Sequence, residues 1–104
     1  MPMTDPRLVG ALGLAVRARG AVIGQQAVTE TVNRRRAKLL LLDPSVSEDS
    51  RDQWEKLAAN ARIPLVVLGE EDLLSRATGR VNARICAVVD SNFVKLIRSR
   101  MEMV

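Results

Sequence analysis

A glycine followed by two glutamines, at residues 24–26, is the first place where the sequence offers groups that suit contact with a ligand. A glycine turn that opens a helix leaves backbone N–H groups unpaired at the positive end of the helix dipole. The amides of Gln25 and Gln26 can donate and accept hydrogen bonds, which suits both base edges and phosphates. The pattern favours a nucleic-acid contact, and the alternative is a turn with a polar cap.

The segment from Ser75 to Arg84 is the second candidate, because it combines three arginines with one small apolar patch. Arginine side chains suit the phosphates of a nucleic-acid backbone, and the patch Val81-Asn82-Ala83 suits packing on an exposed base. The alternative is a solvated loop between a helix and a strand.

Few residues suit catalysis or metal binding. The chain has no histidine and one cysteine, so it lacks a histidine base, a nucleophile–histidine pair and a thiolate zinc site. Cys86 lies in an apolar run and is predicted to be a small buried side chain, with a reactive thiol as the alternative. The acids Asp49/Asp52 and 70–72 fall where helices are predicted to begin, and acids there favour the helix dipole. We predict no enzyme, cofactor or metal, and a small phosphate-handling enzyme is the alternative.

Charge is distributed in blocks along the chain. Residues 43–72 hold eight acidic against three basic residues, whereas the flanks, 1–42 and 73–104, are both net positive within a total of +4. If the flanks meet in the fold, they form a basic surface that suits a polyanion, with the acidic middle on the far side. The alternative is a set of arginines scattered over a solvated surface.

Length and composition predict a single domain. Nearly half of the 104 residues are apolar, which is enough for a core. No apolar stretch approaches the roughly 20 residues of a membrane-spanning helix, and the N-terminus does not have the pattern of a signal peptide. We therefore expect one domain over residues 1–104 in a soluble, cytoplasmic protein.

Helices and strands alternate along the chain with short connections. Periodicity predicts helices over about 6–19, 25–38, 48–61, 70–78 and 91–101, with N-caps at Asp5, in a Ser45–Glu48 capping box, and at Asp90 or Ser91. The third helix is predicted to bury Trp54, Leu57, Ala58 and Ala61. Apolar runs predict strands over about 22–23, 39–42, 63–68 and 84–89. This alternation predicts an α/β fold with helices on both faces of a central sheet.

Several segments carry a family resemblance through their order and spacing. They are Leu12–Gly20, Gly24 with Ala27-Val28, Arg36–Leu42 before an acid, Ile63-Pro64 before an apolar strand, Leu74–Gly79 and Ala87–Asp90. From about Leu8 to Ile97 the chain resembles the L7Ae/L30e/S12e-type ribosomal proteins, above all the small bacterial L7Ae-like proteins. The resemblance implies a three-layer α/β/α sandwich with a mixed four-stranded sheet. It also implies non-enzymatic binding of structured RNA, typically kink-turns or related internal loops.

In that family, the turn opening the second helix reads bases, and the loop before the last strand closes over a flipped nucleotide. Carried over residue by residue, the first surface consists of Gly24, Gln25, Gln26, Ala27 and Glu30. The second surface consists of Arg76, Gly79, Arg80, Val81, Asn82 and Ala83. We expect the amides of Gln25, Gln26 and Asn82 to read bases. We expect phosphates to be neutralised by Arg34, Arg36, Lys38, Arg76, Arg80 and Arg84.

The chain departs from the family pattern at four positions. Kink-turn binders usually carry glutamate, lysine, asparagine and glycine where this chain has Ala27, Glu30, Gln26 and Ser75. A lost acceptor and a reversed charge weaken specific binding, at roughly 1–3 kcal/mol per base contact. The prediction is binding of structured RNA, with ribosomal RNA or the ribosome as a partner. The alternative is a protein-interaction module on the same scaffold with only generic RNA affinity.

Overall fold

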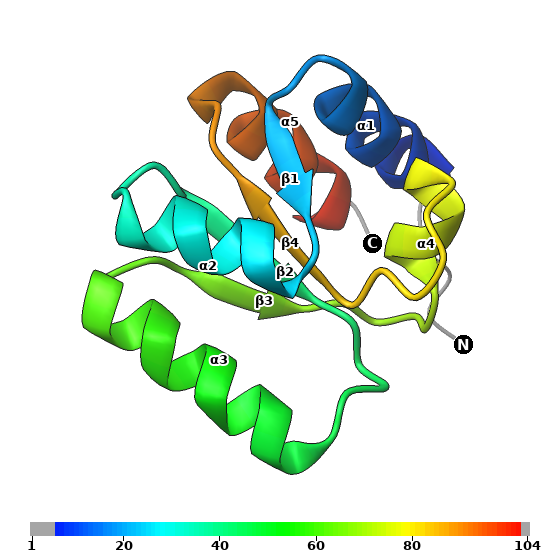
Figure 1. Ribbon diagram of the computed structural model, residues 1–104. Helices are drawn as coiled ribbons and strands as arrows, with labels where there is room; N and C mark the ends of the chain where they lie inside the picture. The colour runs from blue at the N-terminus through cyan, green and yellow to red at the C-terminus, as the bar shows by residue number, and fades with distance from the viewer. Residues whose placement is uncertain (1–5, 103–104) are drawn as a thin grey trace.

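A mixed four-stranded sheet runs through the centre of the protein (Figure 1). The computed structural model describes residues 6–102, and its strands are β1 (Ala21–Ile23), β2 (Leu39–Leu42), β3 (Leu65–Val67) and β4 (Ile85–Val88). Their order is β1-β4-β2-β3, with β2 and β3 parallel and β4 antiparallel to both of its neighbours. The prediction of a mixed four-stranded sheet is confirmed.

Helices cover both faces of this sheet, as Figure 1 shows. On one face lie α1 (Pro6–Arg17), α4 (Leu73–Thr78) and α5 (Ser91–Glu102), and on the other lie α2 (Gln25–Asn33) and α3 (Glu48–Ala61). Each pair of layers encloses a separate cluster of apolar side chains. The α/β fold with three layers is therefore confirmed.

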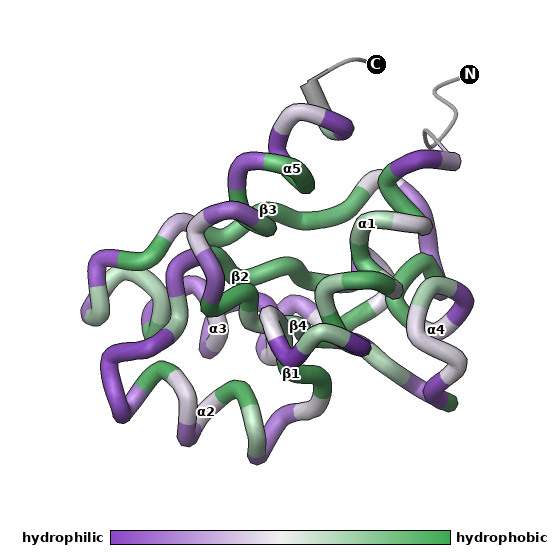
Figure 2. Tube along the Cα trace, turned by 90° about the horizontal axis from the view of Figure 1, so that it is seen from above, coloured by the Kyte–Doolittle hydropathy of each residue, from purple (hydrophilic) through white to green (hydrophobic). Residues whose placement is uncertain are grey.

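Strand β2 shows why the apolar runs are continuous. Leu39 and Leu41 join the core under α1, α4 and α5, whereas Leu40 and Leu42 join the core under α2 and α3. All four side chains have 0% exposure, and a strand buried on both faces must be apolar at every position. Figure 2 shows these strands as hydrophobic segments between more hydrophilic helices and loops.

The start of α3 differs from the prediction. The helix begins at Glu48, and its cap is Ser47, whose hydroxyl oxygen accepts a hydrogen bond from the backbone N–H of Ser50 at 3.1 Å. The predicted capping box at Ser45 is wrong, because the Ser45 hydroxyl donates to Asp43 at 2.6 Å instead. At its other end, α3 leaves the side chain of Ala61 exposed rather than buried.

Helices α2 and α4 are shorter than predicted. Helix α2 ends at Asn33, so the cations of residues 34–38 lie in the connection that follows it. Helix α4 begins at Leu73 rather than at Glu70, because Asp72 has a left-handed backbone with φ of 63°. The acids of residues 70–72 therefore lie in a turn before α4 and not in its first helical turn.

The predicted cap of the last helix is present at Asp90. Its Oδ1 atom accepts a hydrogen bond from the backbone N–H of Asn92 at 2.7 Å. The other predicted cap, Asp5, lies outside the described residues.

Helix α4 and the loop after it are positioned by a close contact with α1. A Cβ atom added at Gly13 would lie 2.7 Å from the carbonyl oxygen of Ala77 on α4, so the two helices meet where only glycine fits. This contact holds the end of α4, and with it the start of the following loop, against α1.

Candidate nucleic-acid interface

The turn between β1 and α2 has the backbone geometry that its glycine predicts. Gly24 has φ of 107°, a region that side chains disfavour, and no side chain caps the helix that it opens. Its N–H donates to the carbonyl of Ile85 at 3.1 Å, which ties the turn to the start of β4. The side chains of Gln25 and Gln26 are exposed, whereas Ala27 is half-buried. The first N–H groups of α2 have no partner within the helix, and the two exposed amides lie next to them in the chain.

The loop between α4 and β4 presents a cation and an apolar side chain. Arg80 is exposed. Val81 has 88% exposure, which makes it the more exposed of the two exposed large hydrophobic side chains among residues 6–102. Asn82 follows with a left-handed φ of 57°. Ala83 then turns inward with 3% exposure, and its N–H donates to the Ser75 hydroxyl oxygen at 2.9 Å. Ala83 was predicted to contact RNA, but its side chain belongs to the core.

Sheet topology brings the turn and the loop together. Because β1 runs antiparallel to β4, the end of β1 lies beside the start of β4, with Ile23 opposite Cys86. Because β2 also runs antiparallel to β4, the end of β2 lies there as well, with Leu42 opposite Ile85. The connections that leave β1 and β2 therefore meet the loop that enters β4 at one end of the sheet, which we call the loop end.

A pocket of about 310 Å³ lies between these connections. The predicted residues Gly24, Gln25, Asn82 and Arg84 line it, so the two predicted surfaces share one hollow. Sequence reasoning missed its third wall, which comes from the connection after β2 and from α3: Val46, Ser47, Ser50 and Trp54. The one available signal was the position of these residues directly after an apolar strand.

A shallower hollow follows the outer side of α2. It is lined by Ile23, the predicted residues of the turn, and Glu30 one helical turn further on. The Gln26 amide donates to the Glu30 carboxylate over 3.5 Å, a long contact that leaves the amide free to bind elsewhere. The negative charge of Glu30 therefore lies beside the amide that is predicted to read bases.

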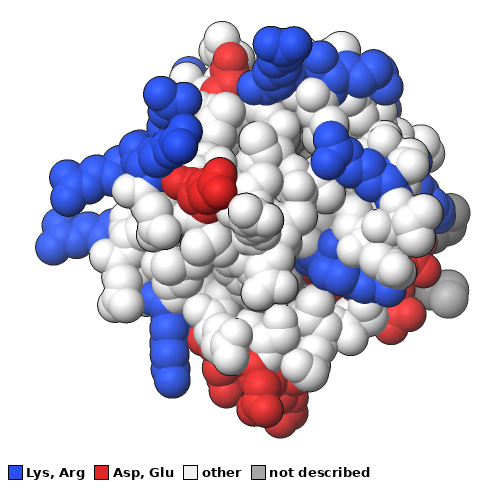
Figure 3. All heavy atoms as spheres, in the orientation of Figure 1, with Lys and Arg blue, Asp and Glu red and all other residues white. Residues whose placement is uncertain are grey.

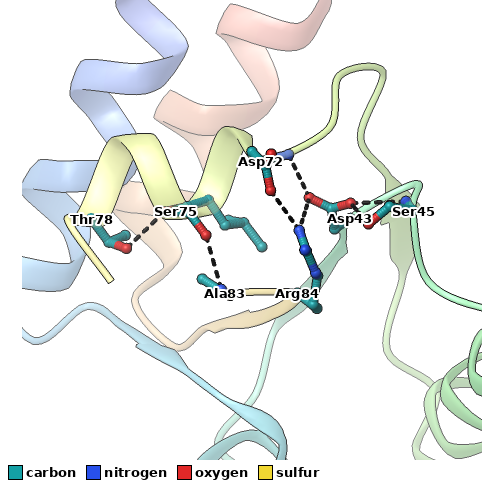
Figure 4. Close-up of polar contacts among 8 residues, drawn as sticks. Asp43, Ser45, Asp72, Ser75, Thr78, Ala83 and Arg84 are labelled. Atoms are coloured by element: carbon teal, nitrogen blue, oxygen red, sulfur yellow. Dashed lines mark hydrogen bonds and ion pairs between the residues drawn. The ribbon is translucent and has the colours of Figure 1, made fainter. Parts of the chain in front are cut away.

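Asp43 holds the inner side of this site together (Figure 4). Its side chain has 0% exposure, and its Oδ1 atom accepts hydrogen bonds from the N–H and hydroxyl of Ser45 at 2.8 and 2.6 Å. Its Oδ2 atom accepts from the N–H of Asp72 at 2.8 Å and lies 3.5 Å from the Arg84 guanidinium. One carboxylate therefore joins the end of β2, the turn before α4 and the start of β4.

The pKa of Asp43 reflects these contacts. Burial by itself raises the pKa of this carboxyl, but the hydrogen bonds from Ser45 and Asp72 and the charge of Arg84 outweigh burial. The net pKa lies below the ordinary value of an aspartate. Asp43 is thus ionised in the folded protein, as an acceptor with four donors around it should be.

Two of the predicted phosphate contacts are already paired with acids. Arg84 donates to Asp72 at 2.7 Å, and this hydrogen bond raises the pKa of Arg84. Arg76 forms an ion pair with Glu70. The acids that pair with them come from the segment that was predicted to lie on the far side. Among the three loop arginines, Arg80 alone forms no ion pair within the described residues.

The remaining predicted cations lie elsewhere. Arg34, Arg36 and Lys38 follow the C-terminal end of α2, and α2 begins at the loop end, so these cations lie at the opposite end of the helix. In Figure 1 the connection from α2 to β2 lies on the left, while the loop between α4 and β4 lies on the right. The structure does not bring them to the pocket.

The acidic start of α3 lies near the pocket and not on a far side. Helix α3 packs in the same layer as α2, and its first turn carries Glu48 and Asp49. In the view of Figure 1, Figure 3 shows basic side chains along the left, upper and right parts of the molecule, and acidic ones at the lower edge, left of the centre, at the top and at the lower right. The expectation of an acidic far side is therefore wrong for α3.

Three further features of the described residues concern metal ligands, the environment of Cys86 and membrane-spanning helices. No group of three or more His, Cys, Asp or Glu side chains within that range is arranged to hold a metal ion. Cys86 is buried as predicted, and burial raises the pKa of its thiol to about 12. No helix in the described part of the chain is long and apolar enough to cross a membrane.

Comparison with known proteins identifies the family. The model of the ribosomal protein L7Ae/L30e/S12e/Gadd45 family matches residues 7–97. The chain belongs to this family. The L7Ae-type resemblance inferred from the segments between Leu8 and Ile97 is thereby confirmed.

Proteins similar to this chain include one whose name states its ligand. The RNA-binding protein YlxQ of Bacillus subtilis is 29% identical over 91 residues, which cover 88% of this chain and 91% of YlxQ. A solved protein of unknown function from Bacillus halodurans has a TM-score of 0.83 at 24% identity, covering 92% of this chain and 97% of its own. The Giardia lamblia 15.5kD RNA binding protein has a TM-score of 0.70 at 15% identity, covering 100% of this chain and 96% of its own. These two structures establish the shared fold.

Proposed function

We propose that this protein binds structured RNA of the kink-turn type, without catalysis, through the loop end of its sheet. The observation that carries the proposal is the pocket where Gly24 and Gln25 meet Asn82, although more than fifty residues separate the two segments. The relative YlxQ, which is similar over most of both chains, is named an RNA-binding protein. Ribosomal RNA, a ribosomal partner and a cytoplasmic location stay predictions.

Each part of the interface has a chemical role in this proposal. The unpaired N–H groups and the amides of Gln25 and Gln26 contact base edges or a phosphate at the start of α2. Asn82 faces the same pocket, and the exposed Val81 packs on an unpaired base. Arg80 neutralises a phosphate. The interface excludes Ala83, which is buried, and Arg84 acts within the protein.

Geometry at the turn also favours a second candidate, a protein-interaction module with generic RNA affinity. Glu30 lies beside Gln26, and the acids that pair with Arg76 and Arg84 reduce the positive charge at the loop end. These contacts leave fewer cations for phosphates than the sequence suggests. Such a module binds RNA only through charge, so its affinity depends steeply on salt and little on RNA shape.

The affinities for a kink-turn RNA and a length-matched duplex, measured at about 50 and 200 mM salt, distinguish the two candidates. We expect tighter kink-turn binding that persists at the higher salt. We expect Gln26→Ala to lower the ratio of the two affinities about 10-fold, within the range for one lost base contact. Thr29→Ala, on the same helix, is the control. Equal affinities that fall together with salt would contradict the proposal and support the interaction module.

A further inference from the structure

A groove lies at the end of the sheet opposite to the loop end. The connections that enter β2 and β3 meet there, because these two strands are parallel neighbours. The C-terminal ends of α2 and α3 converge at the same place, and between them is a hollow of about 640 Å³. Exposed Asn33, Arg35, Asn60 and Arg62 line this hollow together with the partly buried side chains of Leu57 and Ile63. We call it the arginine groove.

Positive charge gathers at the arginine groove without acids to balance it. No acidic residue lines the groove, and Arg34, Arg36 and Lys38 flank Arg35 in the chain. Within the described residues, none of these four cations nor Arg62 forms an ion pair, in contrast to Arg51, Arg76 and Arg84. The negative ends of two helix dipoles offset part of their mutual repulsion. The rest of that repulsion is relieved when a polyanion binds.

The direction of α2 relates this groove to the proposed interface. Helix α2 has nine residues, with the Gly24 turn at its start and the arginine groove at its end. Helix α2 therefore spans about 13 Å, the length of only a few base-pair steps of an A-form RNA duplex. A stem that leaves the pocket along α2 reaches the groove within a few base pairs.

We propose that the arginine groove is a second RNA contact, which binds the backbone of a stem leaving the proposed interface; this inference rests on the proposed function. Arg35 and Arg62 contact phosphates from two sides of the groove. The amides of Asn33 and Asn60 donate to phosphate oxygens or 2′-hydroxyls. The groove adds affinity and orients the stem, and it does not read sequence.

The test compares two variants that remove equal charge. One is Arg35→Ala/Arg62→Ala, and the control is Lys95→Ala/Arg98→Ala on α5, where both side chains are exposed. The ligands are kink-turn RNAs with each stem separately lengthened from about three to about ten base pairs, so that the stem is first shorter and then longer than α2. The measured quantity is the slope of log affinity against log salt concentration for each RNA.

We expect the Arg35/Arg62 variant to flatten the slope by about 1.5 with one long-stem RNA, which corresponds to two lost phosphate contacts. We expect an unchanged slope with the short stems and for the Lys95/Arg98 variant. A slope that flattens equally for short and long stems, or equally in the Lys95/Arg98 control variant, overturns the proposal. A slope that stays unchanged for every RNA also overturns it, and an acidic segment of a protein is then the next ligand to test.

Failure of the proposed function has a separate signature. That function fails when the unmodified protein prefers no kink-turn RNA over a duplex. The second contact fails when stem length does not alter the effect of the Arg35/Arg62 substitutions. Unfolding midpoints of both variants in urea verify that the fold is retained.

Discussion

Charged residues of this protein act in two ways that their types do not distinguish. Asp43 is a buried carboxylate with four surrounding donors, and Arg84 forms ion pairs with Asp43 and Asp72. Arg80, on the same loop, has an exposed side chain and forms no ion pair within residues 6–102. At the residue scale, therefore, the partners of a side chain decide whether it holds the site together or stays available for a ligand.

Replacing Asp43 tests the first of these roles. We expect Asp43→Asn to lower the free energy of unfolding by about 2 kcal/mol at pH 7, because two backbone N–H groups and Arg84 lose a charged acceptor. The folded-state pKa of Asp43 is lowered, so the folded protein binds fewer protons than the unfolded chain. Its contribution is complete above about pH 5 and is lost as the pH falls below about 4. Urea unfolding from pH 7 to 3 measures both effects, with the exposed Asp52→Asn as control.

A stability difference between Asp43→Asn and the unmodified protein that stays constant down to pH 3 would contradict this role. Such a result would mean that the ionised carboxylate does not supply the stabilisation.

Comparison of Arg80→Ala with Arg84→Ala tests the second role. Both substitutions remove one loop arginine, but we expect only Arg80→Ala to flatten the salt dependence of RNA affinity, by about 0.7–0.9 in slope. Arg84→Ala leaves that slope unchanged and instead lowers the free energy of unfolding, because it unpairs Asp43 and Asp72. Salt titrations of RNA binding and urea unfolding separate the two variants. Equal slopes for both would mean that Arg84 leaves its acids to contact RNA.

At the scale of elements, the site depends on where helices and strands end. The ends of β1 and β2 and the start of β4 coincide because β4 is antiparallel to both neighbours. The loop that enters β4 starts where α4 stops, and α4 is fixed against α1 at Gly13. Helix α1, which contributes no residue to the pocket, therefore helps to set its geometry.

Two glycines of α1 provide a matched test of this contact. A Cβ atom at Gly13 would lie 2.7 Å from the Ala77 carbonyl oxygen, whereas nothing lies within 4 Å of a Cβ atom at Gly10. We expect Gly13→Ala to lower the free energy of unfolding by about 1–3 kcal/mol, since α4 must move. We expect Gly10→Ala to be neutral or to stabilise by up to about 1 kcal/mol, because alanine favours helix. Thermal unfolding measures both, and equal effects of the two would contradict the packing.

At the scale of the whole molecule, the two ends of the sheet differ in charge. The loop end combines Arg80, which forms no ion pair with any described residue, with acids that include the first turn of α3. The opposite end carries the arginine groove. The formal charge of +4 is therefore unevenly distributed, and a duplex that lacks a feature matching the pocket meets acids at the loop end.

Neutralising the start of α3 tests this repulsion. We expect Glu48→Gln/Asp49→Asn to raise affinity for a simple duplex more than for a kink-turn RNA, because the repulsion that discriminates against the duplex is removed. Each substitution also lowers stability by about 0.3–1 kcal/mol through the helix dipole. The ratio of the two affinities at a fixed salt concentration is the measured quantity. A ratio that stays constant while both affinities rise would mean that the acids act only through net charge.

The sequence by itself determined the layers of this protein. The apolar runs at 39–42 and 84–89 predicted strands of a sheet covered on both faces, and helical periodicity predicted all five helices of the described residues. These patterns are local, because burial imposes a period of two residues on a strand and 3.6 on a helix. The turn at Gly24 was predictable for the same reason, since its positive φ is a property of one residue.

Only the tertiary structure decided which of the candidate residues act together. Arg76, Arg80 and Arg84 look alike in the sequence, but Arg84 meets an acid 41 residues away and Arg80 meets none among the described residues. The order of the strands likewise decides which residues line each hollow. It brings Val46 and Ser47 to the pocket, and it brings Arg35 and Arg62 to the same groove. Ion pairing and strand order join residues that are distant in the chain, so no local pattern encodes them.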